Sequence, residues 1–141
     1  MLALDANILI RAVLGRRVRA ILTAYAGIVP FFVVDTVAQE AHLRLPEILA
    51  KRQKDPQLGL AVLAEVLEQI DVVELAFYED FEKDAKSRLV RRDLQDWPTA
   101  ALALALDCPI WTEDNDFFRT GIATWTTDRV EIFLRSSVRP S

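Results

Sequence analysis

The 141-residue sequence predicts an α/β domain in which helices cover both faces of a five-stranded parallel sheet. Short apolar runs alternate with helical patterns along the chain, which is typical of this fold class. The runs at residues 1–4 and 31–34 are continuously apolar, and the second is aromatic and β-branched, as expected for strands buried on both faces. The length suits a single domain with a substantial core, to which we assign residues 1–135. We predict that residues 136–141 form a flexible tail.

The expected elements follow one another in a regular order. The predicted strands lie at residues 1–4, 31–34, 71–75, 109–112 and 123–126. Amphipathic or alanine-rich patterns predict helices near residues 7–13, 17–26, from 36 onward, 60–67, 78–90, 97–106 and 128–134. Thr36 and Gln39 fit a capping box at the start of the third helix, and Asp128 and Glu131 occupy capping positions of the last helix. Pro46 is expected to punctuate the helical region after residue 36.

Composition excludes several functional classes. The longest apolar stretches, residues 28–34 and 100–106, are too short to cross a bilayer, and the amino terminus lacks the pattern of a secretory signal. We therefore expect a cytoplasmic protein with no membrane association. The single Cys108 and single His42 leave little for disulfide, thiolate or imidazole chemistry, and the four glycines form no phosphate-binding loop. Carboxylates and hydroxyls remain as candidate functional groups.

The charge distribution is uneven. A net charge of −4 argues against a nucleic-acid binder that relies on simple electrostatic attraction. Residues 1–54, however, hold eight basic and four acidic side chains, whereas the remainder holds nine basic and seventeen acidic ones. Binding of two divalent cations by the acidic part brings the protein close to neutrality. The acidic composition is therefore compatible with a polyanionic substrate.

Acidic residues recur close to the predicted strand ends. They are Asp5, Glu40, Asp96, Asp114 and Asp116. Because parallel strands present their carboxyl ends at one edge of a sheet, where ligands bind, we expect these side chains to converge. Several carboxylates in one place raise each other's pKa, and a bound cation relieves that conflict. Oxygen ligands favour hard ions such as Mg²⁺ or Mn²⁺.

Each acid also has a structural explanation. Asp5 and Asp96 are suited to cap the helices that follow them, and Glu40 is suited to a solvated first helical turn. Asp114 and Asp116 fit a polar turn, in which only one of the two needs to face the site. Three further residues receive structural interpretations: Asp35 as a helix cap, Asp93 as a surface residue, and His42 as a surface or interface residue.

Four sequence blocks resemble the motifs of the PIN-domain family, and within it the VapC-like group of small bacterial ribonucleases. Residues 4–9 (LDANIL) resemble the opening motif, in which an apolar strand runs into Asp-x-Asn. Residues 36–40 (TVAQE) resemble the second block, where a hydroxyl precedes the second acid. Residues 96–103 (DWPTAALA) and 111–117 (WTEDNDF) resemble the third and fourth. The blocks occur in the family's order and together span nearly the whole chain.

The resemblance implies a three-layer α/β/α domain with strand order 3-2-1-4-5. It also implies a Mg²⁺- or Mn²⁺-dependent endoribonuclease that cleaves RNA phosphodiesters with water activated by one or two ions. Toxin members of the group belong to type II toxin–antitoxin systems, so the resemblance implies a small antitoxin partner that inserts into the acidic groove. It further implies a homodimer.

Candidate roles follow from this resemblance and the chemistry of the side chains. Asp5, Glu40, Asp96 and Asp114 are the predicted catalytic acids, and the same four with Asp116 are the predicted metal ligands. The choice between Asp114 and Asp116 as the fourth acid stays open. Three residues complete the predicted site: Asn7 and Thr112, which hold either a phosphate oxygen or a neighbouring carboxylate, and Arg11, which binds the RNA backbone.

Two other functions are compatible with the sequence. The first is a catalytically inert PIN scaffold that binds RNA or acts as a regulatory interaction module. The second is a phosphohydrolase that acts on small phosphate esters. Metal uptake separates the inert scaffold from an enzyme, and turnover of a generic monoester without RNA cleavage identifies the phosphohydrolase.

Overall fold

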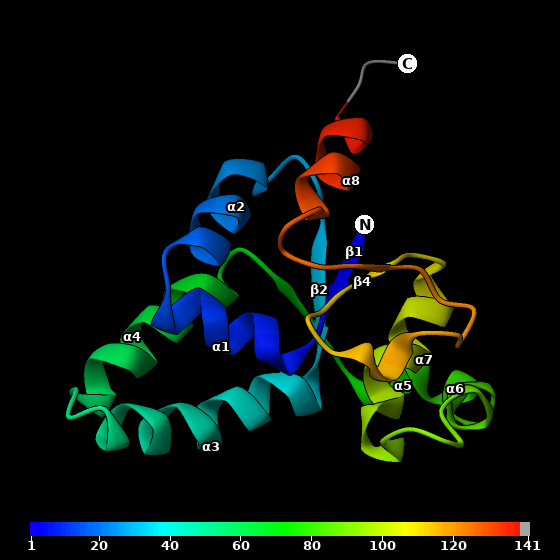
Figure 1. Cartoon of the computed structure of the whole chain (residues 1–141), viewed down its shortest axis with the longest axis horizontal. Helices are drawn as coiled ribbons and strands as arrows, with labels where there is room; N and C mark the ends of the chain where they lie inside the picture. Colours follow the sequence, from blue (N-terminus) through cyan, green and yellow to red (C-terminus); the bar gives the residue numbers. More distant parts are fainter. Residues whose placement is uncertain (139–141) are drawn as a thin grey trace.

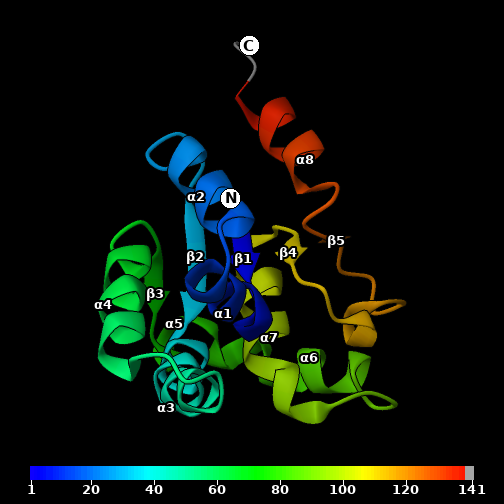
Figure 2. The ribbon, with the colours of Figure 1, turned by 60° about the vertical axis from the view of Figure 1, so that its left-hand side comes forward.

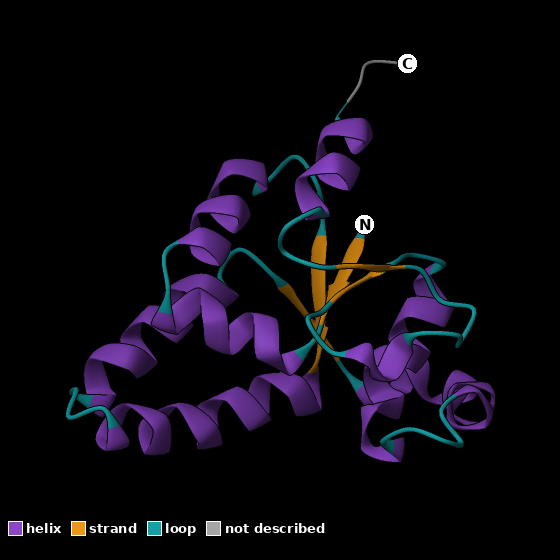
Figure 3. Cartoon of the chain, in the orientation of Figure 1, coloured by secondary structure: helices purple, strands orange, loops and turns teal. Residues whose placement is uncertain are grey.

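The computed structural model describes residues 1–138. Its strands, orange in Figure 3, lie at the centre of the molecule. They form a five-stranded sheet in the order β3-β2-β1-β4-β5. The strands are β1 (Leu2–Leu4), β2 (Phe31–Val34), β3 (Asp71–Val73), β4 (Ile110–Trp111) and β5 (Thr124–Trp125). All four neighbouring pairs are parallel. The predicted α/β class and the strand order implied by the resemblance are confirmed. Since β1 is central, the residue that follows it lies in the middle of the sheet edge.

Helices cover the two faces of the sheet, which gives three layers (Figures 1 and 2). Helices α1 (Ala6–Leu14), α2 (Arg17–Tyr25), α3 (Asp35–Lys51) and α4 (Pro56–Leu67) pack on one side. Helices α5 (Leu75–Tyr78), α6 (Glu82–Arg88) and α7 (Trp97–Leu106) pack on the other. The chain continues to helix α8 (Val130–Ser137). Within residues 1–138, no helix combines the length and the apolar character needed to span a lipid bilayer.

The start of α3 differs from the predicted capping box. The helix begins at Asp35 with Val34 in the N-cap position, so Thr36 does not cap it and Asp35 belongs to its first turn. The Oδ1 atom of Asp35 accepts hydrogen bonds from the Thr36 backbone N–H at 2.9 Å and from the Tyr78 hydroxyl at 2.6 Å. These contacts hold Asp35 in the helix and connect the two helical layers.

The expected helix interruption at Pro46 is also absent. Helix α3 continues through this proline to Lys51, although proline removes one backbone hydrogen bond and crowds the preceding turn. Ala41, Leu45 and Leu49 lie one turn apart on the buried face of α3. Packing of this face offsets the local cost of the proline, which the sequence pattern alone did not show.

Two other helical regions differ from the prediction. In place of the single helix expected over residues 78–90, α5 ends at Tyr78, and the 3₁₀ segment Glu79–Phe81 and then α6 follow it. The last helix begins at Val130 with Arg129 in the N-cap position, so Asp128 does not cap it. The Asp128 carboxylate instead pairs with Arg17 at 3.0 Å. Helix α8 runs to Ser137, two residues past the expected domain boundary at 135. The rest of the predicted tail, from residue 139, lies outside the described residues.

The core joins β1 to α7. Leu2, Ala3 and Leu4 of β1 are fully buried. The small side chains Ala100 and Ala101 of α7 are also fully buried, and small residues allow a helix to approach a sheet closely. Helix α7 contacts β1 and β2. This packing places the beginning of α7 beside the carboxyl end of the central strand.

Candidate functional site

An acidic pocket lies at the carboxyl edge of the sheet. Its volume is about 250 Å³, and its acidic lining residues are Asp5, Glu40, Asp93 and Asp96. Asp5 follows β1, Glu40 lies on α3, and Asp96 directly precedes α7. The predicted convergence of acids from separate strand ends is therefore present for Asp5, Glu40 and Asp96.

Asp5 is the most enclosed of these acids, with 5% of its surface exposed. Its carboxylate accepts hydrogen bonds from the Ala6 backbone N–H at 2.8 Å, the Thr112 hydroxyl at 2.8 Å and the Asn7 side-chain amide at 3.0 Å. Burial raises the pKa of Asp5; the bonds from Thr112 and Ala6 oppose this, and the nearby charges of Asp114 and Glu40 add to it. Asp5 both caps α1 and faces the pocket.

Asn7 and Thr112 hold the loop after β4 against Asp5. The Thr112 hydroxyl accepts a hydrogen bond from the Asp114 backbone N–H at 2.9 Å, and the side-chain oxygen of Asn7 accepts one from the Glu113 N–H at 3.2 Å. Both side chains also donate to the Asp5 carboxylate, so of their two predicted roles the structure displays contact with a neighbouring carboxylate. Their contact with a substrate phosphate stays a prediction.

Asp96 carries the least compensated charge in the pocket. Burial, followed by the charges of Asp5, Asp93, Asp114 and Asp116, raises its pKa from 3.8 to about 8. Asp96 occupies the N-cap position of α7, but its side chain makes no capping hydrogen bond. Its Oδ2 atom is buried and has no hydrogen-bond partner within residues 1–138. The expected capping contact of Asp96 is therefore not made.

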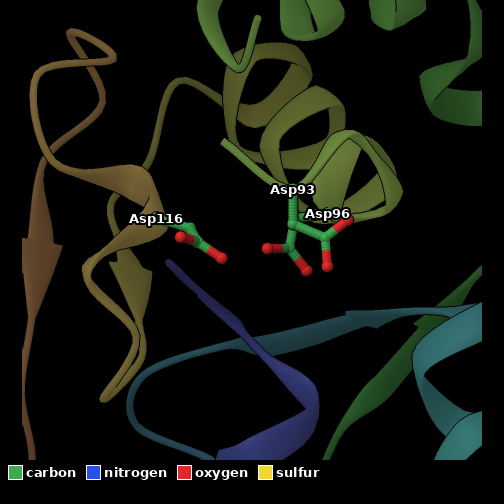
Figure 4. Close-up of side chains that lie close together, drawn as sticks. All are labelled: Asp93, Asp96 and Asp116. Carbon is green, nitrogen blue, oxygen red and sulfur yellow. The ribbon is translucent and has the colours of Figure 1, made fainter. Parts of the chain in front are cut away.

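Asp93, for which the sequence predicts a surface position, is exposed and is also a functional candidate. One carboxylate oxygen each from Asp93, Asp96 and Asp116 lies within 4.8 Å of the other two (Figure 4). Asp93 caps the 3₁₀ segment Leu94–Asp96, and residues three apart in such a turn lie on one side of it. The signal was the three-residue spacing of Asp93 and Asp96, which brings them together only if this segment is helical.

Asp114 and Asp116 both contribute to the same acidic region, in different ways. The Asp114 side chain accepts a hydrogen bond from the Asp116 backbone N–H at 3.0 Å and caps the 3₁₀ segment Asn115–Phe117. Its charge is close enough to raise the pKa of both Asp5 and Asp96. Asp116 instead brings its carboxylate into the cluster with Asp93 and Asp96.

The chain matches the family model described as the PIN domain over residues 3–135. It belongs to the PIN-domain family. None of the curated proteins with which the sequence was compared matches it. The family resemblance inferred from the four sequence blocks is thereby confirmed.

Solved structures share the fold of this PIN domain at low sequence identity. VapBC2 from Rickettsia felis, crystallised with a DNA fragment from its promoter, is 16% identical with a TM-score of 0.67, covering 89% of this chain and 97% of the other. PAE2754 from Pyrobaculum aerophilum is 16% identical with a TM-score of 0.68, and the match covers 96% of this chain and 89% of the other. FitAcB from Neisseria gonorrhoeae is 20% identical with a TM-score of 0.61, and the match covers 90% of this chain and 98% of the other.

The donor set of the PIN domain suits a hard divalent cation. All of the acidic side chains in the pocket offer oxygen, the donor that Mg²⁺ and Mn²⁺ prefer. The buried Oδ2 atom of Asp96 without a partner is the observation that tests this fit, because a cation supplies the missing contact. The raised pKa of Asp96 has the same origin. The residues present therefore fit a bound divalent ion.

Glu40 and Arg11 lie further from the centre of the acidic cluster. Glu40 is at the rim of the pocket, with 47% of its side chain exposed, and Arg44 approaches its carboxylate to 3.8 Å. Arg11 does not line the acidic pocket. It lies in a separate cleft of about 540 Å³ near the opposite end of α1. The predicted contact of Arg11 with RNA thus belongs to that cleft.

Proposed function

We propose that this PIN domain is a Mg²⁺- or Mn²⁺-dependent endoribonuclease and the toxin component of a type II toxin–antitoxin system. The observation that carries the proposal is the buried, unpartnered oxygen of Asp96 within a group of acids brought together from four chain segments. Membership of the PIN-domain family supports a nuclease. The VapC-like sequence blocks, together with a fold shared with VapBC2 and FitAcB, support the toxin assignment.

The acids have separate tasks in the proposed reaction. Asp5, Asp96 and Asp114 would bind one or two ions. Asp116 and Asp93 add negative charge beside them. Glu40, at the rim of the pocket, would bind an ion directly or through water. A bound divalent ion supplies Lewis-acid chemistry, because it lowers the pKa of water and offsets charge on a phosphate. Thr112 and Asn7 fix the Asp5 carboxylate, so that its oxygens keep one orientation while substrate enters.

The residues around the pocket favour attack by water over attack by a protein nucleophile. Its described lining contains carboxylates, Gln95, two threonines, a valine and a proline, and no imidazole or thiol. The Asp5 carboxylate already accepts three hydrogen bonds, which keeps it in place as an ion ligand. The loop that carries Asp114 is fastened to the same carboxylate through Thr112.

The test is cleavage of single-stranded RNA by the purified protein with Mn²⁺. We expect cleavage by the unmodified protein, none after EDTA treatment, recovery when Mn²⁺ is restored, and none with Asp5→Asn. Hydrolysis of a generic phosphate monoester serves as the second substrate. Unchanged cleavage in both EDTA and Asp5→Asn contradicts the proposal, as does turnover of the monoester alone.

The proposed toxin acts with protein partners. The VapC-like resemblance supports a small antitoxin that covers the acidic groove and a homodimer of this chain. Co-expression with the product of the adjacent reading frame, followed by a cleavage assay, tests the antitoxin. Sedimentation of the purified chain tests the dimer. A neighbouring protein that neither binds the chain nor lowers its activity contradicts the antitoxin assignment.

A further inference from the structure

A second cleft of this PIN domain has the opposite charge from the acidic pocket. Its volume is about 540 Å³, and its lining includes Arg11, Arg16, Arg17 and Arg52. These arginines come from the last turn of α1, the N-cap and first residue of α2, and the C-cap of α3. Three separate segments thus bring four guanidinium groups to one cleft in a chain whose net charge is −4.

Most of these guanidinium groups are available to a ligand. Arg11, Arg16 and Arg52 are exposed, and no carboxylate within residues 1–138 forms a salt bridge with them. Arg17 pairs with Asp128 at 3.0 Å, and both side chains are largely exposed. An exposed ion pair of this kind contributes little, so an incoming anion exchanges easily for Asp128.

The acidic residues of this cleft do not cancel its positive charge. Besides Asp128, the cleft contains Glu113. The Glu113 carboxylate accepts a hydrogen bond from the Thr127 backbone N–H at 2.7 Å, which fixes it in the cleft wall. Four arginines against two acids leave the cleft net positive.

Helix α1 connects the arginine cleft to the acidic pocket. Asp5 caps the beginning of α1, and Arg11 lies in its last turn, about 9 Å further along the helix axis. Asn7 and Arg11 are four residues apart and so share one face of α1. Asn7 holds the backbone of Glu113, which lines the cleft and directly precedes Asp114. The two regions are therefore connected through α1 and through the loop that carries Glu113 and Asp114.

We propose that the arginine cleft binds backbone phosphates of the RNA chain whose scissile phosphate lies at the acidic pocket, an inference that rests on the proposed function of that pocket. The planar guanidinium group matches two phosphate oxygens at once, and such contacts position a nucleic acid without reading its bases. RNA is favoured over an acidic peptide because it carries a phosphate at every nucleotide, so a single strand occupies both regions together.

The experiment measures RNA binding with turnover prevented. Labelled single-stranded oligouridine is titrated with the full chain in EDTA at several salt concentrations, and fluorescence anisotropy reports the Kd. We compare Arg16→Gln/Arg52→Gln with the matched control Lys83→Gln/Arg135→Gln, which removes the same charge from exposed positions outside both cavities. We expect the cleft variant to bind about tenfold more weakly and its salt slope to fall by about 0.7 per lost contact.

Each other outcome has a definite meaning. Absence of binding by the unmodified chain, or equal losses in the two double variants, overturns the proposal. Tighter, arginine-dependent binding of polyglutamate than of RNA also overturns it, because the cleft then serves an acidic protein partner. Cleavage with Mn²⁺ is measured separately. If RNA binding depends on the cleft but no cleavage occurs, only the nuclease function is refuted. If the cleft variant cleaves RNA with an unchanged KM, only the role of the cleft in RNA binding is refuted.

Discussion

The acidic pocket and the arginine cleft lie towards opposite ends of the same helix but are built differently. In the pocket, Asp5 is buried and held by three hydrogen bonds, and Asp96 is forced close to other carboxylates. In the cleft, Arg11, Arg16 and Arg52 are exposed and free of ion pairs within the described chain. The crowded carboxylates of the pocket require a compensating positive charge, whereas the exposed arginines of the cleft are available to bind an anion.

Under the proposed function, this difference accounts for the action of an acidic PIN domain on a polyanion. Buried like charges are unfavourable, and the cost is reduced by hydrogen bonds, by protonation or by a cation held close to them. Exposed arginines have no such requirement, and their flexible side chains adapt to a chain of phosphates. Substitutions in the pocket should therefore change metal binding and cleavage, whereas substitutions in the cleft should change RNA affinity.

The largest effect is expected for Asp96→Asn. The change replaces the carboxyl group at the most crowded position by an amide of the same shape. The pocket therefore loses an anionic ligand for the ion, and the fold is preserved. Calorimetric titration should show no Mn²⁺ uptake, and RNA cleavage should fall by about a thousandfold or more. RNA binding in EDTA should be unchanged, because the cleft is intact and Asp96, with a pKa of about 8, is already mostly protonated near neutral pH.

The matched control for Asp96→Asn is Asp80→Asn, which removes the same charge from an exposed position outside the pocket. It should keep both Mn²⁺ uptake and cleavage. Normal metal binding by Asp96→Asn would show that the buried Oδ2 atom of Asp96 does not bind an ion. The contrast drawn between the acidic pocket and the arginine cleft would then be wrong.

A smaller effect is expected for Thr112→Val. The hydroxyl donates to Asp5 at 2.8 Å and accepts from the Asp114 N–H at 2.9 Å, so its loss releases two acids at once. Affinity for Mn²⁺ should fall by about 10- to 100-fold, as for other residues that orient metal ligands. Thr127→Val is the control, because that buried hydroxyl accepts from the Trp111 indole and, within residues 1–138, forms no hydrogen bond with a carboxylate. Equal losses in both variants would mean that only stability was affected.

The sequence predicted the parts of the molecule that depend on strand order. A continuously apolar run before Asp5 and another before Asp114 indicate two buried parallel strands, and parallel strands end at the same edge. Asp93 was not predicted, because its contribution depends on a 3₁₀ turn that leaves no periodic pattern. The continuous α3 was missed for a similar reason: tertiary packing overrides the local preference of Pro46.

The contribution of Asp93 can be measured through a matched pair of helix caps. The carboxylates of Asp93 and Asp55 both accept a hydrogen bond from the backbone N–H two residues later, at 2.9 Å in each case. Asparagine caps as well as aspartate, so each Asp→Asn change keeps the cap and removes the charge. Asp93→Asn should weaken Mn²⁺ binding about three- to tenfold, and Asp55→Asn should not. Identical affinities would leave Asp93 as a cap alone.

The smallest expected effect concerns the stability of the metal-free PIN domain. Folding raises the pKa of Asp96 from 3.8 to about 8, so the folded state holds this proton more tightly than the unfolded state. Between these two values the unfolded chain binds fewer protons, and the free energy of unfolding therefore decreases as the pH rises. In EDTA, the Tm should be lower at pH 8 than at pH 6 by about a few degrees.

The variant Asp96→Asn and the addition of Mn²⁺ test whether Asp96 causes this pH dependence. Asp96→Asn should flatten it, since the amide does not titrate. Mn²⁺ should raise the Tm most at pH 8, where the carboxylates are charged and bind the ion best. A slope that survives Asp96→Asn would show that crowding in the acidic pocket does not govern the stability.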